Sequence, residues 1–248
     1  MKEGWQEKRL ADVCLIKPPK SEVRETLSSN ASVSFLPMED LGVDQKFFRA
    51  TQERPLAAVS GSYTYFANGD VLLAKITPCF ENGKLGIARE LTNGIGFGSS
   101  EYVVFRPSES LSKEWLYYWL SREDFRTEGA QRMTGAVGHK RVPREFIESY
   151  PIPIPPLPEQ QRMVGILDQA FEAIATAKAN AEKNLQNARA IFESHLQSIF
   201  TQRGKGWEVR KIAEIANHSL GKMLDKAKNK GALQPYRPRP EGGRLGRG

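Results

Sequence analysis

The chain has 248 residues and is 40% hydrophobic, which allows one or two domains with an ordinary packed core. No apolar run approaches the roughly 18 residues of a membrane span, and the start, MKEGWQEKRL, lacks a signal-peptide core, so a soluble cytoplasmic protein is expected. The formal charge of +7 is poor evidence for a nucleic-acid partner, because eight basic and two acidic residues after position 216 leave only +1 for residues 1–216.

Residues 1–150 are expected to form one α+β domain. The β-rich runs at 62–66, 71–76, 84–90 and 101–107 are separated by glycine-containing gaps, including the turn at 68–70. Residues 111–123 then change to the helical period, with Ser112 as a plausible N-cap. Several strands followed by a helix favour an α+β domain over a doubly wound sheet.

A proline-rich connector at 151–158 is followed by one long predicted helix at 159–203. Prolines at 151, 153, 155 and 156 favour extended backbone, whereas Pro158 suits the first helical position. Apolar or small residues then recur from 163 to 199 in steps of three or four, which is the helical period. A helix roughly 60 Å long cannot bury such a stripe against its own small domain, so it needs another long helix.

An internal repeat relates the two ends of this unit. GWQEKRLADVC at 4–14 matches GWEVRKIAEIA at 206–216 without gaps, with glycine, tryptophan and alanine identical. Residues 204–236 are therefore interpreted as the start of a second, truncated unit. The basic segment 237–248 has one aliphatic residue and is expected to be a disordered tail.

No catalytic constellation is recognisable, which predicts a chain that is not an enzyme and holds no cofactor or metal. The glycines at 94, 96 and 98 open no helix, and no Walker sequence is present. Asp70, Glu81 and Lys84 lack the spacing of a nuclease site, and IPPL at 154–157 lacks the polar and aromatic residues of an amino-methyltransferase motif. The histidines are scattered, and Cys14 and Cys79 are expected to be buried reduced thiols.

Polar residues in the domain form a candidate DNA-binding set, because arginine and lysine hold phosphates and several of these side chains read base edges. The set comprises Lys75, Lys84, Ser99, Ser100, Tyr102, Arg132, Thr134, His139, Lys140 and Arg141. Residue types alone leave an alternative open, namely a solvated basic loop with salt bridges to Glu123, Asp124 or Glu128.

Three segments together resemble the specificity subunit of type I restriction-modification systems. They are residues 69–88, residues 133–168 with PIPIPPLPEQQR at 151–162, and the following helix. The resemblance implies a target-recognition domain that reads one part of a split double-stranded DNA sequence. It also implies a helix that serves as a ruler. Catalysis would lie on partner modification subunits, which bind S-adenosylmethionine and dock on the helical region, and a restriction subunit would complete the complex.

The resemblance extends to one half of a standard subunit plus the opening of the second, so the helix is expected to pair antiparallel with its copy in a homodimer. The expected interface residues are Leu167, Phe171, Ile174, Leu185, Phe192, Leu196 and Ile199. Identical domains related by a twofold axis read an interrupted palindrome. The alternatives are a non-catalytic protein-interaction scaffold with a helical dimerisation rod, and a fragment of a methyltransferase or nuclease.

Overall fold

The computed structural model describes residues 4–24, 27–202 and 204–216. The chain divides into two compact units, residues 1–182 and 183–248, and the long helix α7 (Leu157–Thr201) begins in the first and ends in the second. The predicted tail at 237–248, residues 217–236 of the predicted second repeat, and His218 lie outside the described residues.

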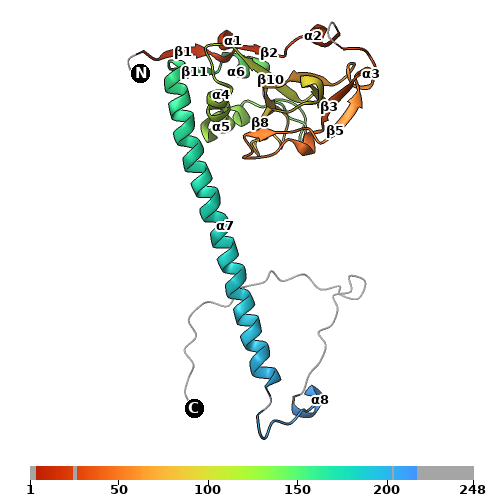
Figure 1. Cartoon of the computed structure of the whole chain (residues 1–248), viewed down its shortest axis with the longest axis vertical. Coiled ribbons are helices and arrows are strands. Elements are labelled where there is room, and N and C mark those ends of the chain that lie inside the picture. Colours follow the sequence, from red (N-terminus) through yellow and green to blue (C-terminus); the bar gives the residue numbers. More distant parts are fainter. Residues whose placement is uncertain (1–3, 25–26, 203, 217–248) are drawn as a thin grey trace, which may run out of the picture. The chain divides into compact units, whose positions relative to one another are not determined.

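Short strands and short helices make up most of the first unit (Figure 1). The strands are β1 (Gln6–Arg9), β2 (Cys14–Ile16), β3 (Ser32–Leu36), β4 (Phe47–Phe48), β5 (Gln52–Pro55), β6 (Thr64–Ala67), β7 (Val71–Ala74), β8 (Leu85–Ala88), β9 (Ile95–Gly98), β10 (Tyr102–Pro107) and β11 (Pro151–Ile154). The other helices of this unit are α1 (Leu10–Val13), α2 (Ser21–Arg24), η1 (Met38–Asp40), α3 (Leu56–Val59), η2 (Thr92–Gly94), α4 (Lys113–Leu120), α5 (Glu123–Gln131) and α6 (Arg144–Ser149). The second unit contains α8 (Ile212–Ile215).

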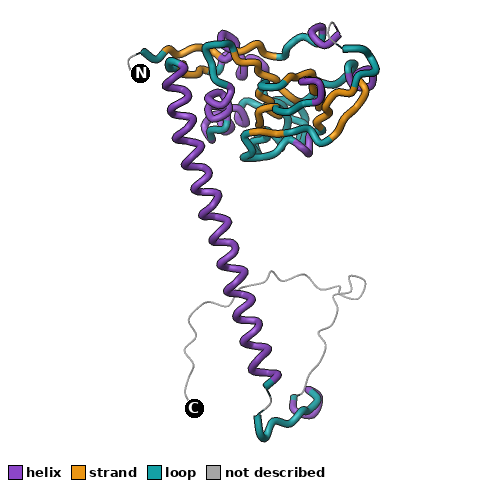
Figure 2. The backbone as a smooth tube through the Cα atoms, in the orientation of Figure 1, coloured by secondary structure: helices purple, strands orange, loops and turns teal. Residues whose placement is uncertain are grey.

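The strands form three sheets, with orders β2-β10-β7-β8-β4, β5-β3-β9-β6 and β1-β11. The central strand β7 is antiparallel to both neighbours and buried on both faces, which explains its uninterrupted apolar sequence VLLA. Figure 2 shows the sheets of the first unit gathered with its short helices in one domain, from which α7 emerges. The predicted α+β class with one long helix is confirmed.

The predicted strands at 62–66, 71–76, 84–90 and 101–107 correspond to β6, β7, β8 and β10, and the predicted helix corresponds to α4. Ser112 caps α4 as expected, because its hydroxyl accepts a hydrogen bond from Trp115 N at 3.3 Å. The interpretation of Gly96 and Gly98 as gap residues was wrong, since both lie in the buried strand β9. A Cβ on Gly96 would collide with the Phe66 ring, and one on Gly98 with the Leu36 carbonyl, so close packing requires glycine in this strand.

The proline connector contains an edge strand, β11, which pairs antiparallel with β1 at the start of the chain. Leu10 N donates to Tyr150 O at 3.0 Å, so by alternation Ile152 and Ile154 take the hydrogen-bonded positions opposite β1. Pro151 and Pro153 therefore place their missing N–H groups on the other edge, where no partner strand is needed. Their carbonyls accept hydrogen bonds from the indoles of Trp119 and Trp115, each at 2.9 Å.

A buried glutamine fixes the start of α7. Gln160 is fully buried; its Oε1 accepts from Ser112 N at 2.9 Å, and its Nε2 donates to Ser110 O at 2.9 Å and Pro155 O at 2.8 Å. Each amide group thus has a partner, as burial requires. The helix begins two residues earlier than predicted, so Pro158 is its second residue.

The first turns of α7 pack on the domain, and later turns do not. Asp168 accepts hydrogen bonds from Lys46 and Tyr118, and the Phe171 ring stacks on Tyr118 with centroids 5.7 Å apart. Phe171, a predicted interface residue, therefore also contributes to the domain. Half-buried Leu167 lies in the same region.

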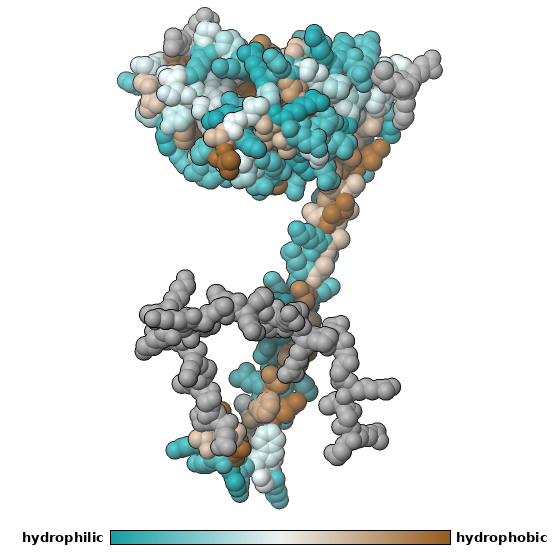
Figure 3. Space-filling model, turned by 180° about the vertical axis from the view of Figure 1, so that it is seen from behind, coloured by the Kyte–Doolittle hydropathy of each residue, from teal (hydrophilic) through white to brown (hydrophobic). Residues whose placement is uncertain are grey.

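Beyond these turns the apolar stripe is exposed in the described chain. Ile174 is 61% exposed, Leu185 54% and Phe192 63%. Leu196 and Ile199 are exposed as well. Figure 3 shows apolar side chains on the surface of the helix. None of the described helices is both long and apolar enough to cross a membrane.

Gln160→Ala is expected to lower the free energy of unfolding by about 2–4 kcal/mol, because it leaves a buried N–H and two carbonyls without partners. Chemical denaturation followed by circular dichroism measures this change. The matched control is Gln161→Ala, which truncates the exposed neighbour and is expected to have little effect. Equal losses for the two variants would contradict the anchoring role of Gln160.

Candidate nucleic-acid interface

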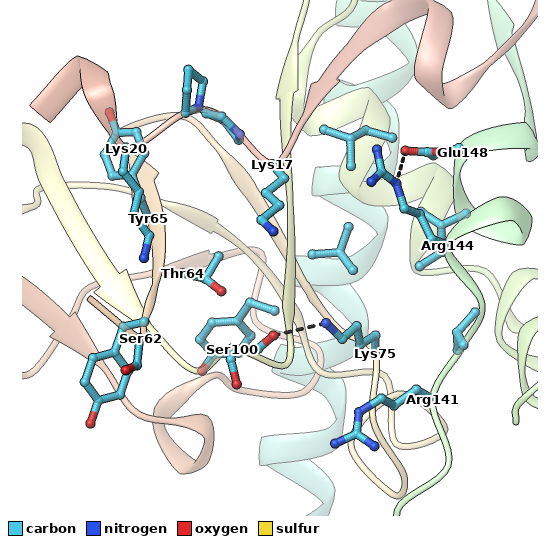
Figure 4. A pocket seen from close by; sticks show the side chains of 18 residues that line it. Lys17, Lys20, Ser62, Thr64, Tyr65, Lys75, Ser100, Arg141, Arg144 and Glu148 are labelled. Atoms are coloured by element: carbon cyan, nitrogen blue, oxygen red, sulfur yellow. Dashed lines mark hydrogen bonds and ion pairs between the residues drawn. The ribbon is translucent and has the colours of Figure 1, made fainter. Parts of the chain in front are cut away.

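A cavity of about 570 Å³ opens in the domain between the two larger sheets and α6 (Figure 4). Its walls come from the segment after β2, the start of β6, the residue after β7, the turn before β10 with the first residues of β10, and residues 141–148. The lining cations are Lys17, Lys20, Lys75, Arg141 and Arg144, whereas Glu148 is the one acidic residue of the lining. Such an excess of positive charge suits an anion.

Two of these cations, Arg141 and Lys75, lie beside one carboxylate, that of Glu101. Arg141 binds Glu101 with two hydrogen bonds, at 2.7 and 2.9 Å, and Lys75 Nζ lies 4.0 Å from the same carboxylate. The Arg141 hydrogen bond lowers the pKa of Glu101. Burial lowers the pKa of Lys75, and the charges of Arg141 and Lys17 lower it further against the opposing effect of Glu101. The cluster therefore carries more positive charge than Glu101 neutralises.

The glycine-rich loop is attached beside this cluster. Thr134 and Arg141 exchange backbone hydrogen bonds at 3.0 and 2.8 Å, which closes the loop. Thr77 N donates to Lys140 O at 2.9 Å, and Val142 N donates to Lys75 O at 2.9 Å, which join the loop to the end of β7. Its tip, residues 135–140, is exposed to solvent. Gly135 and Gly138 have φ values of 122° and 80°, which favour glycine.

The structure brings most of the candidate DNA-binding residues together. Lys75, Ser100 and Arg141 line the cavity, and Lys75 Nζ donates to Ser100 O at 3.0 Å. Half-buried Ser99 immediately precedes Ser100, and exposed Thr134, His139 and Lys140 lie on the adjoining loop. Arg132 closes the C-terminal end of α5, where its guanidinium lies 4.9 Å from the Phe146 ring centroid.

Two candidates are placed differently. Tyr102 also lines the cavity, but its side chain is buried and its hydroxyl donates to Pro37 O at 2.8 Å; its place in the DNA-binding set stays a prediction. Burial also raises the pKa of this hydroxyl. Lys84 is directed to η1, where its Nζ donates to Met38 O at 2.7 Å and Glu39 O at 3.2 Å, and it does not line the cavity.

The acidic residues named in the alternative of a solvated basic loop are not the partners of Arg141. Arg141 pairs with Glu101, which follows β9, and not with Glu123, Asp124 or Glu128 of α5. The antiparallel bridge between Ile76 and Arg141 places the loop just after the end of β7, where Lys75 N donates to Glu101 O at 3.0 Å.

Sequence reasoning missed Lys17, Lys20, Tyr63 and Arg144 in the cavity lining. The run KPPK at 17–20 carried a signal, since it places two lysines close together on either side of two prolines. Lys20 Nζ donates to the carbonyls of Ser60 and Gly61 at 3.1 and 2.6 Å. No sequence pattern indicated Arg144, because its position depends on the packing of α6.

A charged network supports the wall behind Tyr65. Arg106 on β10 makes two hydrogen bonds to the buried carboxylate of Asp70, at 2.8 and 2.9 Å, and a third to Glu22 at 2.6 Å. Tyr65 OH on β6 donates to the same Glu22 oxygen at 3.1 Å, so the network joins the two larger sheets. The Arg106 hydrogen bond lowers the pKa of Glu22. Asp70 is thus a structural ion-pair partner.

Both cysteines are free thiols, as expected, but only Cys14 is buried; Cys79 is half-buried. Burial raises the pKa of Cys14 to about 12, which makes this thiol unreactive. His139 and His195 are exposed. Across residues 4–24, 27–202 and 204–216 no group of three histidine, cysteine or acidic residues is placed to hold a metal ion.

Comparisons with known proteins agree on one family. Residues 2–186 match the family model described as the type I restriction modification DNA specificity domain. The chain is 33% identical over 217 residues to the type I restriction enzyme EcoAI specificity subunit of Escherichia coli, covering 87% of this chain and 35% of that protein. It is 39% identical over 198 residues to the EcoEI specificity subunit of the same organism, covering 79% of this chain and 33% of that protein.

A solved structure, the HsdS subunit from Thermoanaerobacter tengcongensis, shares the fold with a TM-score of 0.50 and 24% identity, over 72% of this chain and 40% of that one. The chain spans about a third of the length of the two curated relatives.

Arg141→Gln is expected to remove a contribution to stability that depends on pH. Because the folded pKa of Glu101 is lowered, the pair stabilises the fold above the unfolded pKa of glutamate, about 4.3, and this contribution is lost as pH falls through the folded value. The difference in unfolding free energy between wild type and variant should therefore shrink in acid. Lys140→Gln, which removes a neighbouring charge without touching Glu101, is the control. A difference that does not change with pH would contradict the assignment.

Proposed function

Because the chain belongs to the family of type I restriction modification DNA specificity domains, we propose that its first 150 residues read one part of a bipartite double-stranded DNA target. The observation that supports this function best is the cation cluster of Lys17, Lys75 and Arg141 beside the exposed glycine-rich loop. Family membership supports DNA as the class of ligand, and the cluster supports this surface as its binding site.

Phosphate contacts are assigned to the cluster. A phosphate oxygen can take the place of a Glu101 oxygen on Arg141, whose planar guanidinium binds either group with two hydrogen bonds. Lys17 is exposed and lies close enough to affect Lys75 electrostatically, so it adds attraction without a rearrangement. These contacts position the domain on the duplex but carry no sequence information.

Base reading is assigned to the loop tip and the adjacent turn. Thr134, His139 and Lys140 are exposed there, and Ser99 and Ser100 flank the cavity. These side chains supply both donors and acceptors, which base edges in the major groove require. Because tight hydrogen bonding at Thr134 and Arg141 fixes the base of the loop, its tip is presented from a rigid support.

Lys140→Ala and Arg141→Ala are each expected to weaken DNA binding and leave the oligomeric state unchanged. Loss of one phosphate contact should reduce the slope of log affinity against log salt by about 1, whereas loss of a base contact should relax specificity and cost about 1–3 kcal/mol. Titration of the target identified by methylome sequencing, against a scrambled duplex at several salt concentrations, distinguishes these results. Lys178→Ala, an exposed lysine on α7, is the control. Unchanged affinity in both loop variants would remove this loop from the interface.

The exposed part of α7 is proposed to pair antiparallel with its copy and to receive the modification subunits. Its large apolar residues Ile174, Leu185 and Leu196 recur at intervals of eleven, or about 3.67 residues per turn, close to the 3.6 of a straight helix. The stripe therefore remains on one side over its whole length. Two straight helices can then stay in contact without strong supercoiling.

A twofold dimer would place two identical domains at the ends of the helix pair and read an interrupted palindrome. The helix length would set the spacer between the half-sites. Methylation of adenine would take place on the modification subunits, which bind S-adenosylmethionine, and a restriction subunit would complete the assembly. The chain itself would be non-catalytic: transfer of labelled methyl groups to DNA by the purified chain alone would overturn this assignment.

Light scattering is expected to show a dimer at micromolar concentration, and Leu185→Glu is expected to convert it to a monomer, because it places charge in the apolar stripe. Ala190→Glu introduces the same carboxylate on the opposite face and should remain dimeric. A monomeric wild type would exclude the homodimer.

A dimer that does not discriminate between DNA sequences would favour the alternative function, a protein-interaction scaffold with a helical dimerisation rod. The exposed stripe also suits this alternative.

A further inference from the structure

The two copies of the internal repeat adopt the same local structure in different surroundings. Arg9 and Lys211 precede one-turn helices, with φ and ψ of −79° and 153° in the first copy and −72° and 144° in the second. In both, an acidic side chain three residues later accepts from the backbone N–H of this residue, at 3.3 Å from Asp12 and 3.4 Å from Glu214. Gly4 and Gly206 both have positive φ, at 82° and 97°.

Among the described residues, the apolar side chains are buried in the first repeat and exposed in the second. Leu10 is fully buried and Val13 is 2% exposed, whereas their counterparts Ile212 and Ile215 are 67% and 64% exposed. Trp207, the counterpart of Trp5, is 53% exposed. The second copy is therefore folded locally but presents its apolar side chains to solvent.

The surface that binds residues 4–14 consists of β11 and neighbouring residues. The backbone of 6–9 pairs with β11, Leu10 N donates to Tyr150 O, and Ser108 N donates to Val13 O at 2.9 Å. The Trp5 ring meets the Trp115 ring edge to face, with centroids 6.1 Å apart. Because the prolines remove the donors from its other edge, β11 can accept one such element at a time.

We infer that residues 206–216 are a second docking element, which binds β11 and the neighbouring helices of a second copy of this chain in place of that copy's residues 4–14. Residues 206–216 match residues 4–14 in sequence, in capping and in backbone angles. They therefore offer the same backbone and apolar groups that β11 and the neighbouring helices bind in residues 4–14. Exchange of one element for an equivalent one between two copies has a low energetic cost.

The length of α7 directs the element to a second copy. A continuous helix of 45 residues is about 68 Å long, whereas the stretch from 202 to 211, fully extended, reaches about 35 Å. The inference rests on the proposed antiparallel dimer, in which the C-terminal end of one helix lies beside the start of the other, next to β11. Such pairing raises the effective concentration of the element at this edge.

Disulfide trapping tests the exchange in the full-length chain. Arg9 lies opposite Pro151 in a non-hydrogen-bonded pair, where Cα atoms lie about 4.5 Å apart and a disulfide fits. Lys211 is the residue of the second repeat that corresponds to Arg9. In a Cys79→Ser background, Lys211→Cys with Pro151→Cys is expected to give a disulfide-linked dimer on non-reducing electrophoresis, and either cysteine alone is not. Arg9→Cys with Pro151→Cys, the reference pair, should close within one chain.

Two further variants separate docking from chance collision. Adding Ile212→Asp should reduce the yield of linked dimer about tenfold or more, the factor expected when one buried aliphatic side chain is lost. Adding Ala213→Asp, whose counterpart Ala11 is exposed, should not. Cross-linking that survives Ile212→Asp overturns the inference. A dimer by light scattering with no linked product overturns the docking alone and leaves the proposed helix pairing intact, whereas a monomer overturns both.

Discussion

The buried amide of Gln160 fixes the point at which the long helix leaves the domain. It joins the first turn of α7 to the backbone before α4 and to the end of the proline segment, through three hydrogen bonds. The prolines of β11 act in the same place, because they leave one pairing edge for β1 and direct two carbonyls to tryptophan indoles. Together these contacts hold the start of α7 at one place on the domain.

Charge in the candidate interface is organised by one carboxylate. Glu101 holds Arg141 and lies near Lys75, while Lys17 lines the same cavity and adds its positive charge near Lys75. A cation cluster with incomplete neutralisation is preorganised for an anion, since its repulsion falls when a phosphate binds. The Arg106 network behind Tyr65 differs, because buried Asp70 and Glu22 both bind the same guanidinium. The first arrangement suits binding and the second suits stability.

The two repeats separate the effect of local hydrogen bonding from the effect of burial against the domain. The second element keeps its capping and its one-turn helix although its apolar side chains are exposed, so sequence-local interactions alone suffice for that conformation. Burial of Leu10 and Val13 against the domain adds the hydrophobic contribution that holds the first element in place. The counterparts of the buried residues in the second element remain exposed.

The period of apolar residues determined α7, its length and its exposed stripe, because 3.6-residue spacing and the absence of internal proline are local properties. Alternation and turn residues likewise determined β6, β7, β8 and β10, and the GW repeat was visible without a structure. Tertiary structure decided what depends on distant contacts. Phe66 and Leu36 approach β9 so closely that only glycine fits at positions 96 and 98. Tyr102 is buried, and its hydroxyl donates a hydrogen bond to Pro37 O. It also decided that Arg141 meets Glu101 rather than the acids of α5, since pairing between β7 and the loop depends on sheet packing that no local pattern encodes.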